Sequence, residues 1–219
     1  MRATLFDFNG VLVDDEHVHL EACREVLAPQ GVVVSDADYA EKYLGFDDVG
    51  AFRAILRDAG HDASEATVAR LVVAKTPAYF RRIETALRIF PGAVELLRRR
   101  ADVGLVGIVS GALRPEIEHA LSRMGVADRV TFIVSAEDTT ACKPDPEGFA
   151  AGLARVPGGA RVVVVEDSVA GVQAAKAAGL RCVAVTHSYP RQALLAAGAD
   201  LVVDALTQLD DAALDGGGP

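Results

Sequence analysis

Short apolar runs alternate with longer amphipathic segments along most of this chain. The short runs consist largely of β-branched and aliphatic residues and span residues 4–6, 105–109, 130–134, 162–165, 182–185 and 201–203. Their length suits buried strands, and strands that alternate with helices form βαβ units around a parallel sheet. The pattern therefore predicts an α/β fold.

The segment between the first two predicted strands follows a different pattern. Residues 16–27, 51–59 and 63–86 read as successive helices, without a convincing strand between them. We therefore predict an all-helical insertion over residues 14–89, and an α/β core made of residues 1–13 and 90–219. Pro91 marks the return to the core, because proline is favoured in the first turn of a helix, here predicted over 92–100. Gly179 is expected to end a helix over 169–178.

Composition narrows the class of protein further. The 219 residues are 51% hydrophobic but only 5% aromatic, and an interior rich in Ala, Val and Leu is typical of a parallel sheet covered by helices. A formal net charge of −9 argues against a nucleic-acid partner. Three widely spaced cysteines imply no disulfide framework, and no apolar run is long enough to span a membrane. We expect a soluble, cytoplasmic protein.

The first candidate functional residues lie at the end of the first predicted strand. Asp7 directly follows that strand and is followed in turn by Asn9 and Gly10. Ligands of open α/β sheets bind beyond the carboxyl ends of the strands, where Asp7 is expected to lie. Acidic and amide residues before glycine are also ordinary turn residues, so a plain turn is an equally open interpretation.

Two adjacent acids, Glu166 and Asp167, follow the predicted strand over 162–165. Buried carboxylates are costly unless a cation binds them. Asp167 or Ser168 could instead cap the next helix, although one cap explains only one of the two acids. Together with Asp7, Asp167 offers the hard oxygen ligands that Mg²⁺ prefers.

Two further strand ends carry polar residues. Ser110 and Gly111 close the predicted strand over 105–109, and a hydroxyl with free backbone N–H groups before a helix can bind an anion. A plain helix cap is the commoner role of such a serine. Lys143 lies in a double-proline turn after the strand over 130–134, where it would stabilise a nucleophilic carboxylate and a phosphate if held near them. A solvated surface lysine is the alternative.

In order and placement these residues resemble the four motifs of the haloacid dehalogenase-like (HAD) hydrolase superfamily, in its phosphatase and β-phosphoglucomutase-like branch. The resemblance covers essentially the whole chain and rests on Asp7-Phe8-Asn9-Gly10-Val11, Ser110, Lys143-Pro144 and Glu166-Asp167. Residues 13–16 with His19 resemble the entry to the helical cap of that branch, and Leu44-Gly45-Phe46 resembles its substrate loop. The resemblance implies a Rossmann-like core with residues 14–89 as the cap.

It also implies roles for individual residues. Asp7 would attack phosphorus and ligate Mg²⁺, together with the Asn9 backbone carbonyl, the Asp167 carboxylate and a direct or water-mediated contact from Glu166. The phosphoryl oxygens would be held by Ser110, Gly111 and Lys143, and the cap would contact the substrate through His19, Gly45 and Asp48. Phosphoryl transfer requires mainly positioning and charge neutralisation, which this set supplies.

Asn9 departs from the family pattern, which usually places there a second Asp that protonates the leaving alcohol and activates water. General acid–base help contributes roughly 10²- to 10⁴-fold, so its loss predicts slow turnover of alkyl phosphates. Asp15, His17 and His19 could substitute from the cap, although packing within the cap is the more common role for such residues.

The sequence thus predicts a Mg²⁺-dependent phosphatase that acts on a small-molecule phosphate ester. A catalytically weakened phosphate-binding or regulatory protein is the alternative that Asn9 leaves open. A phosphomutase is less favoured, because Asp47 and Asp48 would repel a second phosphate, and a dehalogenase would leave Glu166 and Asp167 without a purpose.

Overall fold

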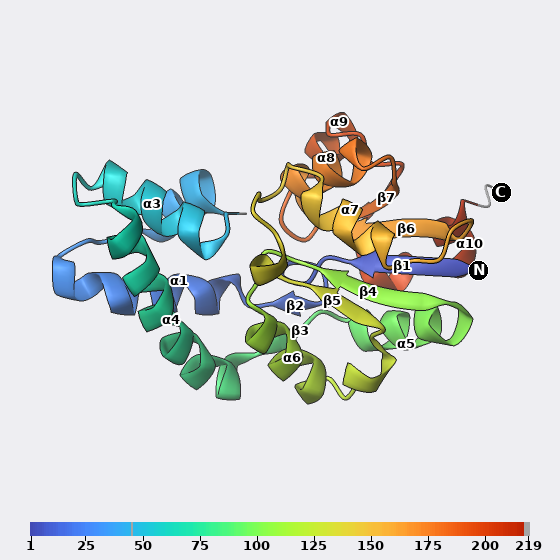
Figure 1. The fold of residues 1–219 in the computed structure, drawn as a ribbon, viewed down its shortest axis with the longest axis horizontal. Coiled ribbons are helices and arrows are strands. Elements are labelled where there is room, and N and C mark those ends of the chain that lie inside the picture. The colour runs from blue at the N-terminus through green and yellow to red at the C-terminus, as the bar shows by residue number, and fades with distance from the viewer. Residues whose placement is uncertain (45, 217–219) are drawn as a thin grey trace. The chain divides into compact units, whose positions relative to one another are not determined.

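The computed structural model describes residues 1–44 and 46–216 (Figure 1). The chain divides into two compact units, one made of Met1–Asp14 with Ile89–Pro219 and the other of Asp15–Arg88. The first unit holds a six-stranded sheet and the second is helical. The predicted fold class, a parallel α/β core with a helical insertion, is confirmed.

The sheet has the strand order β5-β4-β1-β6-β7-β8, and all of its neighbouring strands are parallel. Its strands are β1 (Arg2–Phe6), β4 (Leu105–Val109), β5 (Phe132–Val134), β6 (Arg161–Glu166), β7 (Arg181–Val185) and β8 (Leu201–Val203). The order reverses beside β1, since β4 and β5 extend the sheet on one side and β6 to β8 on the other. Such a switch point opens a crevice at the carboxyl ends of the strands.

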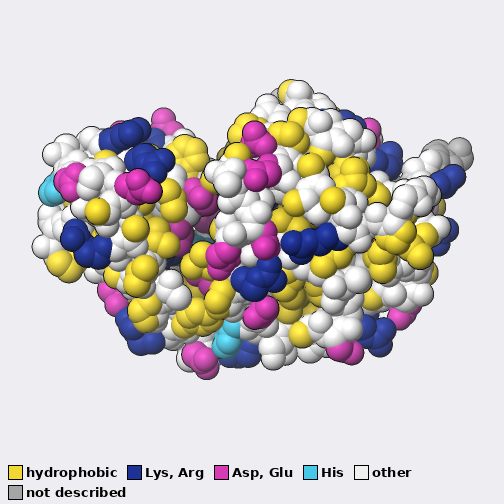
Figure 2. All heavy atoms as spheres, viewed as in Figure 1, with side chains coloured by type: hydrophobic (Ala, Val, Ile, Leu, Met, Phe, Trp, Pro, Cys, Tyr) yellow, Lys and Arg dark blue, Asp and Glu magenta, His cyan; other side chains and the backbone are white. Residues whose placement is uncertain are grey.

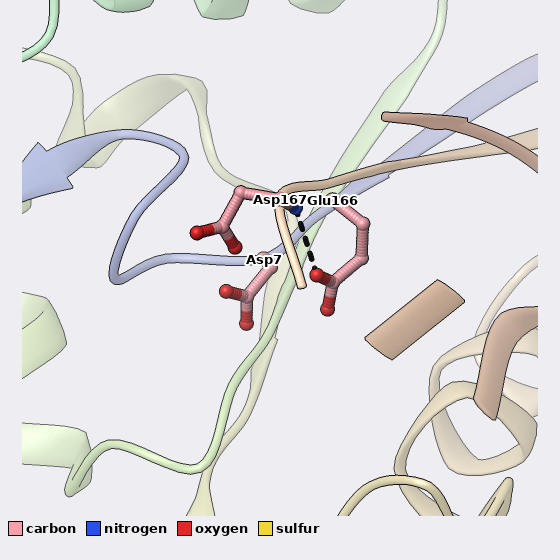
Figure 3. A group of neighbouring side chains, drawn as sticks. All are labelled: Asp7, Glu166 and Asp167. Atoms are coloured by element: carbon pink, nitrogen blue, oxygen red, sulfur yellow. Dashed lines mark hydrogen bonds between the residues drawn. The ribbon is translucent and has the colours of Figure 1, made fainter. Parts of the chain in front are cut away.

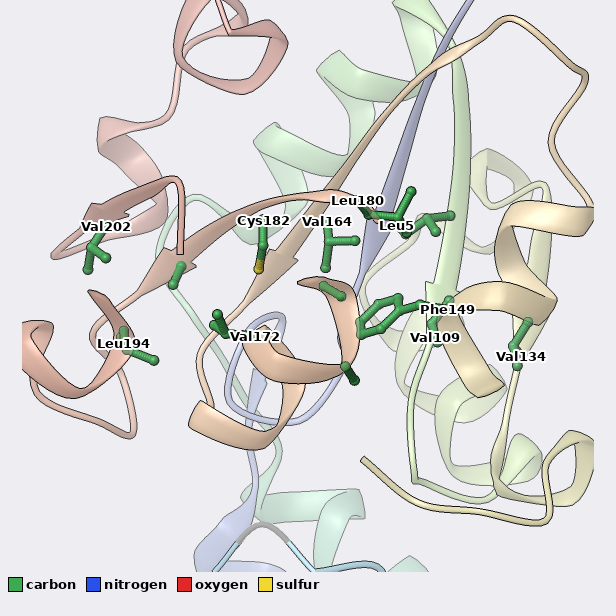
Figure 4. Packing of buried hydrophobic residues seen from close by; sticks show 13 residues of the cluster. Leu5, Val109, Val134, Phe149, Val164, Val172, Leu180, Cys182, Leu194 and Val202 are labelled. Carbon is green, nitrogen blue, oxygen red and sulfur yellow. The ribbon is translucent and has the colours of Figure 1, made fainter. Parts of the chain in front are cut away.

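Helices cover both faces of this sheet. On one face α7 (Glu147–Ala154), α8 (Val169–Ala177) and α9 (Arg191–Ala196) bury Phe149, Val172 and Leu194 against strand residues such as Leu5 and Val164 (Figure 4). On the other, α5 (Ala93–Val103) packs on β1 and β4, and α10 (Asp211–Asp215) packs on β6. Strands buried on both faces lack polar alternation, which explains the continuous apolar runs in the sequence.

Several boundaries differ from the predicted ones. α5 begins at Ala93, because Gly92 is its N-cap with φ of 85°, so Pro91 precedes the helix and does not lie in its first turn. β5 begins at Phe132, after a 3₁₀ turn at Ala127–Arg129. Gly179 lies one residue past the C-cap of α8 with φ of 73°, as expected for a helix-ending glycine. Two short strands, β2 (Val13–Asp14) and β3 (Arg88–Ile89), form a separate sheet that the sequence pattern did not indicate.

The helical unit contains α1 (Glu16–Leu27), α2 (Asp36–Asp38), α3 (Asp48–Asp58) and α4 (Glu65–Ala86), with a π-helical turn at Tyr39–Tyr43. Its core joins Leu27, Phe52, Leu56 and Val68. Among the described residues, no helix combines the length and apolar content that crossing a bilayer requires.

Candidate active site

The first carboxylate of the site follows the central strand. β1 lies between β4 and β6, and the Asp7 N–H donates to the Val165 carbonyl at 2.9 Å, which extends the sheet register by one residue beyond Phe6. The Asp7 side chain therefore emerges at the carboxyl edge, where it is 10% exposed. This is the strand-end position that the sequence predicted.

Glu166 ends β6 and is completely buried. Its Oε2 accepts from the backbone N–H groups of Asp167 at 2.9 Å and Ser168 at 3.0 Å, and from the Ser168 hydroxyl at 3.0 Å. Ser168 is the N-cap of α8 and accepts from the Gly171 N–H. The cap is therefore Ser168, so capping explains neither acid directly.

Lys143 reaches two of these carboxylates. Its Nζ donates to Asp7 Oδ1 at 2.5 Å and to Glu166 Oε1 at 2.6 Å, and it lies 5.1 Å from the centre of the Phe149 ring. A lysine that makes two short charge-assisted contacts is not a solvated surface lysine. The loop after β5 thus brings a fixed cation to the end of β1.

The acids outnumber the cation within this cluster. Carboxylate oxygens of Asp7, Glu166 and Asp167 all lie within 4.8 Å of one another, and Figure 3 shows the three side chains gathered at the strand ends. Burial raises the pKa of Asp7 to about 7, with Lys143 opposing and Glu166 reinforcing the shift. Burial and the charges of Glu166 and Asp7 raise the pKa of Asp167 well above its ordinary value. Burial acts to lower the pKa of Lys143, but its two acidic partners raise it overall.

Ser110 connects the end of β4 to this cluster. Its hydroxyl donates to Asn9 Oδ1 at 3.3 Å and accepts from the Ala112 N–H at 3.1 Å, while its own N–H donates to the Val134 carbonyl. The following helix, α6 (Arg114–Arg123), has Leu113 as its N-cap. The helix-cap interpretation of Ser110 is therefore wrong, and Gly111 lies in the loop before the helix.

Comparison with known proteins identifies the family. The family model of haloacid dehalogenase-like hydrolases matches residues 1–179. The chain belongs to this family.

Several relatives align with nearly the full length of this HAD-like hydrolase. Validoxylamine A 7'-phosphate phosphatase of Streptomyces hygroscopicus subsp. limoneus is 29% identical over 95% of both chains. Protein CbbY of Cereibacter sphaeroides is 31% identical over 95% of this chain and 94% of its own. A crystal structure of mutant CbbY from Rhodobacter sphaeroides, in complex with xylulose-(1,5)bisphosphate, superimposes with a TM-score of 0.85 at 29% identity, covering 98% and 99% of the two chains.

The helical unit of the hydrolase contains its own buried polar cluster. Lys75 has no exposed surface, contacts Nδ1 of His19 at 2.6 Å and forms an ion pair with Asp48. His19 Nε2 lies 3.3 Å from Asp15, which also accepts from the Tyr79 hydroxyl at 2.5 Å. Asp15 and His19 therefore take part in packing within this unit, in line with the alternative to catalysis.

The acidic loop of this unit is also internally partnered. Asp47 is the N-cap of α3 and accepts from the Gly50 N–H at 2.7 Å, and Asp48 is paired with Lys75. Gly45, the third residue expected to contact the substrate, lies outside the described residues. Of the two acids expected to repel a second phosphate, Asp48 is thus paired with a cation and Asp47 caps a helix.

Three residues at these clusters were not identified from the sequence. Lys75 has no local signal, because it lies in the middle of a long helix. His187 and Ser188 follow β7, and Ser188 donates to Asp167 while His187 Nδ1 lies 2.7 Å from the Gly10 carbonyl. The strand-end rule that identified Asp7 and Glu166 could have identified this loop too.

Proposed function

We propose that this hydrolase is a Mg²⁺-dependent phosphatase that cleaves small-molecule phosphate monoesters through an aspartyl phosphate on Asp7. The observation that carries the proposal is the Asp7 carboxylate, held at 2.5 Å by Lys143 beside two further buried carboxylates at the carboxyl edge of the sheet. The phosphatase name of one relative, and the sugar bisphosphate bound to another, support a phosphate ester as substrate.

The residues fit a divalent cation. Three buried carboxylates lie beside one lysine, which contacts Asp7 and Glu166. Burial is the main cause of the raised pKa values of Asp7 and Asp167, and the neighbouring carboxylates add to it, so a bound cation would offset the cost of ionising them. Mg²⁺ would be held by Asp7, the Asn9 carbonyl and Asp167, with Glu166 contacting it directly or through water, and when bound it supplies charge neutralisation for the phosphoryl group.

The protein's own residues then carry the reaction. A carboxylate oxygen of Asp7 forms a bond to phosphorus as the bond from phosphorus to the ester oxygen breaks, and the departing oxygen takes a proton from solvent and leaves as the alcohol. Water then attacks phosphorus and gives up a proton to solvent as the bond from phosphorus to the Asp7 oxygen breaks, which releases inorganic phosphate and regenerates Asp7. Lys143 orients Asp7 and, with Ser110 and Gly111, binds the phosphoryl oxygens, so that positioning accounts for most of the catalysis.

Asn9 limits this reaction. Its amide cannot protonate a leaving alkoxide or take a proton from water, and its Oδ1 already accepts from the Ser110 hydroxyl. We expect Asn9→Asp to accelerate hydrolysis of alkyl phosphates more than of p-nitrophenyl phosphate, because an acid helps most where the leaving oxygen is most basic. Equal acceleration of both substrates, or none, contradicts this role.

The second candidate function is a phosphate-binding or regulatory protein with little turnover, and the observation that favours it is again Asn9. Hydrolysis of p-nitrophenyl phosphate with and without Mg²⁺ distinguishes the two, since this leaving group needs little protonation. Asp7→Asn is the matched control, because it removes the nucleophile while nearly keeping its shape. We expect Mg²⁺-stimulated turnover that this variant abolishes; an inert native protein that still binds phosphate favours the binding function.

The substrate class is decided by the helical unit. Asp47 and Asp48 disfavour substrates with a second anionic group, although the ion pair of Asp48 with Lys75 reduces the repulsion. A screen that compares monophosphates having neutral or cationic remainders with bisphosphates and phosphorylated acids tests it. Preference for bisphosphates would remove the objection to a phosphomutase as well.

We further propose that the protein works in the cytoplasm on small molecules and does not bind nucleic acid. The net charge of −9 argues against nucleic-acid binding, as does the scattering of Lys and Arg among acidic and apolar side chains on the face in Figure 2.

A further inference from the structure

The loop that follows β7 makes contacts that none of the four motifs explains. Ser188 Oγ donates a hydrogen bond to Asp167 Oδ2. The neighbouring His187 ring stacks on Phe90, with ring centres 3.8 Å apart and planes 11° from parallel, and its Nδ1 lies 2.7 Å from the Gly10 carbonyl oxygen. One short loop thus contacts both a proposed metal ligand and the turn after the nucleophile.

The two oxygens of Asp167 have different surroundings. Oδ2 accepts from Ser188 and lies against Gly10, where an added Cβ would be only 2.0 Å away. Oδ1 accepts no hydrogen bond from any residue in the described part of the chain. The serine hydroxyl and the close approach of Gly10 together cover Oδ2, orient the carboxylate and leave Oδ1 as the oxygen available to a cation.

Both peptide groups that flank Gly10 are also held. The Gly10 N–H donates to the Val13 carbonyl at 2.9 Å, and the Gly10 carbonyl accepts from His187. The peptide between Asn9 and Gly10 is planar and trans, so its carbonyl points opposite to the Gly10 N–H. Holding Gly10 on both sides therefore sets the direction of the Asn9 carbonyl.

We infer that Ser188 and His187 are positioning residues for the Mg²⁺ ligands: Ser188 selects which oxygen of Asp167 faces the cation, and His187 holds the turn that carries the Asn9 carbonyl. The inference rests on the proposed function, because it presupposes a cation at Asp7 and Asp167. Hydrogen bonds that orient metal ligands contribute about 10- to 100-fold to metal affinity or activity.

Isothermal titration of Mg²⁺ into the otherwise native protein tests the inference without using turnover. We expect Ser188→Ala to weaken Mg²⁺ binding by about 10- to 100-fold, and Ser188→Thr to retain most of the affinity, since it keeps the hydroxyl. His187→Phe keeps a ring to stack on Phe90 but loses the hydrogen bond, and should weaken binding by less. Thr186→Val is the matched control, because it removes from the same loop a hydroxyl that bonds to Asp204 and not to a ligand.

The pair Ser188→Thr and Ser188→Val provides a second comparison, since both side chains have one shape and differ in the hydroxyl. Denaturant unfolding of each variant without metal separates lost affinity from lost structure. Equal Mg²⁺ affinity in the Thr and Val variants, or in Ser188→Ala and the native protein, overturns the role of Ser188. Asp167→Ala distinguishes the two proposals: if it too leaves Mg²⁺ binding unchanged, the metal assignment itself is wrong.

Discussion

Replacing Lys143 by Met should destabilise the metal-free protein in a way that depends on pH and on Mg²⁺. Lys143 is the cation that contacts two carboxylates of the cluster, Asp7 and Glu166. Methionine is unbranched and flexible, so it can keep the packing on Phe149 while removing the charge. The substitution therefore tests the electrostatic balance of the site.

The distances from Lys143 to its two carboxylates determine how large the loss of stability should be. At 2.5 and 2.6 Å, an effective dielectric constant of about 20 gives a gross attraction of about 6 kcal/mol for each of the two ion pairs. Desolvation of the charges and repulsion among the carboxylates offset much of this. Removing one partner of a buried ion pair costs about 3–5 kcal/mol, which is the loss expected here at about pH 8.

The loss should shrink as the pH falls. Burial raises the pKa of Asp7 to about 7, and removing Lys143, which opposes that shift, raises it further. An acid with a raised pKa in the folded state destabilises the fold above its unfolded value and costs nothing once protonated in both states. The native and variant proteins then differ in the protonation of Asp7 only above about pH 7, so the loss should be largest at about pH 8 and above, and fall to a smaller, constant value below about pH 7. Saturating Mg²⁺ should also reduce the loss, because it restores positive charge.

Denaturant unfolding at several pH values, with EDTA or with Mg²⁺, measures these effects. The matched control is Lys176→Met, which removes an ion pair with Asp200 at 2.8 Å whose two side chains are 35% and 31% exposed, and it should cost at most about 1 kcal/mol at any pH. If Lys143→Met is as stable as the native protein in EDTA at about pH 8, or if the loss of stability does not depend on pH, then the charge of Lys143 does not balance the buried carboxylates.

Three further predictions concern single residues. Gly10→Ala should weaken Mg²⁺ binding measured by titration, because its Cβ would lie 2.0 Å from Asp167 Oδ2, whereas Gly60→Ala, with a similar φ and nothing within 4 Å, should cost only backbone strain of about 1–3 kcal/mol. Asn9 should stay amidated in peptide mass spectra of aged protein, because the Gly10 nitrogen that would attack it is held in a hydrogen bond; rapid deamidation contradicts this. Burial raises the pKa of Glu16, so Glu16→Gln should raise the unfolding temperature at about pH 8 and leave it unchanged at about pH 4; an equal gain at both would show that charge is not the cause.

Much of the site could be predicted from local sequence. Parallel strands place their carboxyl ends at one edge of the sheet, so the polar residues that directly follow apolar runs, Asp7, Ser110 and Glu166, are predicted to meet there. Their mutual contacts could not be predicted. Lys143 meets Asp7 across 136 residues of sequence, and its choice of two carboxylates depends on how the loop after β5 folds back.

The helical unit shows where such reasoning fails. Asp47 and Asp48 were counted as two charges that repel a second phosphate, but the side chain of Lys75, on another helix, neutralises one of them. The net charge that a loop presents to a ligand depends on ion-pair partners that are distant in sequence. The composition of the loop alone therefore does not predict it.

Hydrophobic periodicity and strand-end placement are local properties of a chain, so the parallel sheet, the helical insertion and the chemical types of residue at the strand ends could be predicted from the amino-acid sequence. Three other properties emerge only in the folded chain: which groups neutralise one another, which oxygen of Asp167 accepts from Ser188, and how burial moves the pKa values of Asp7 and Asp167. Hydrogen bonds and desolvation act over a few ångströms in space, and separation along the chain does not reveal those distances.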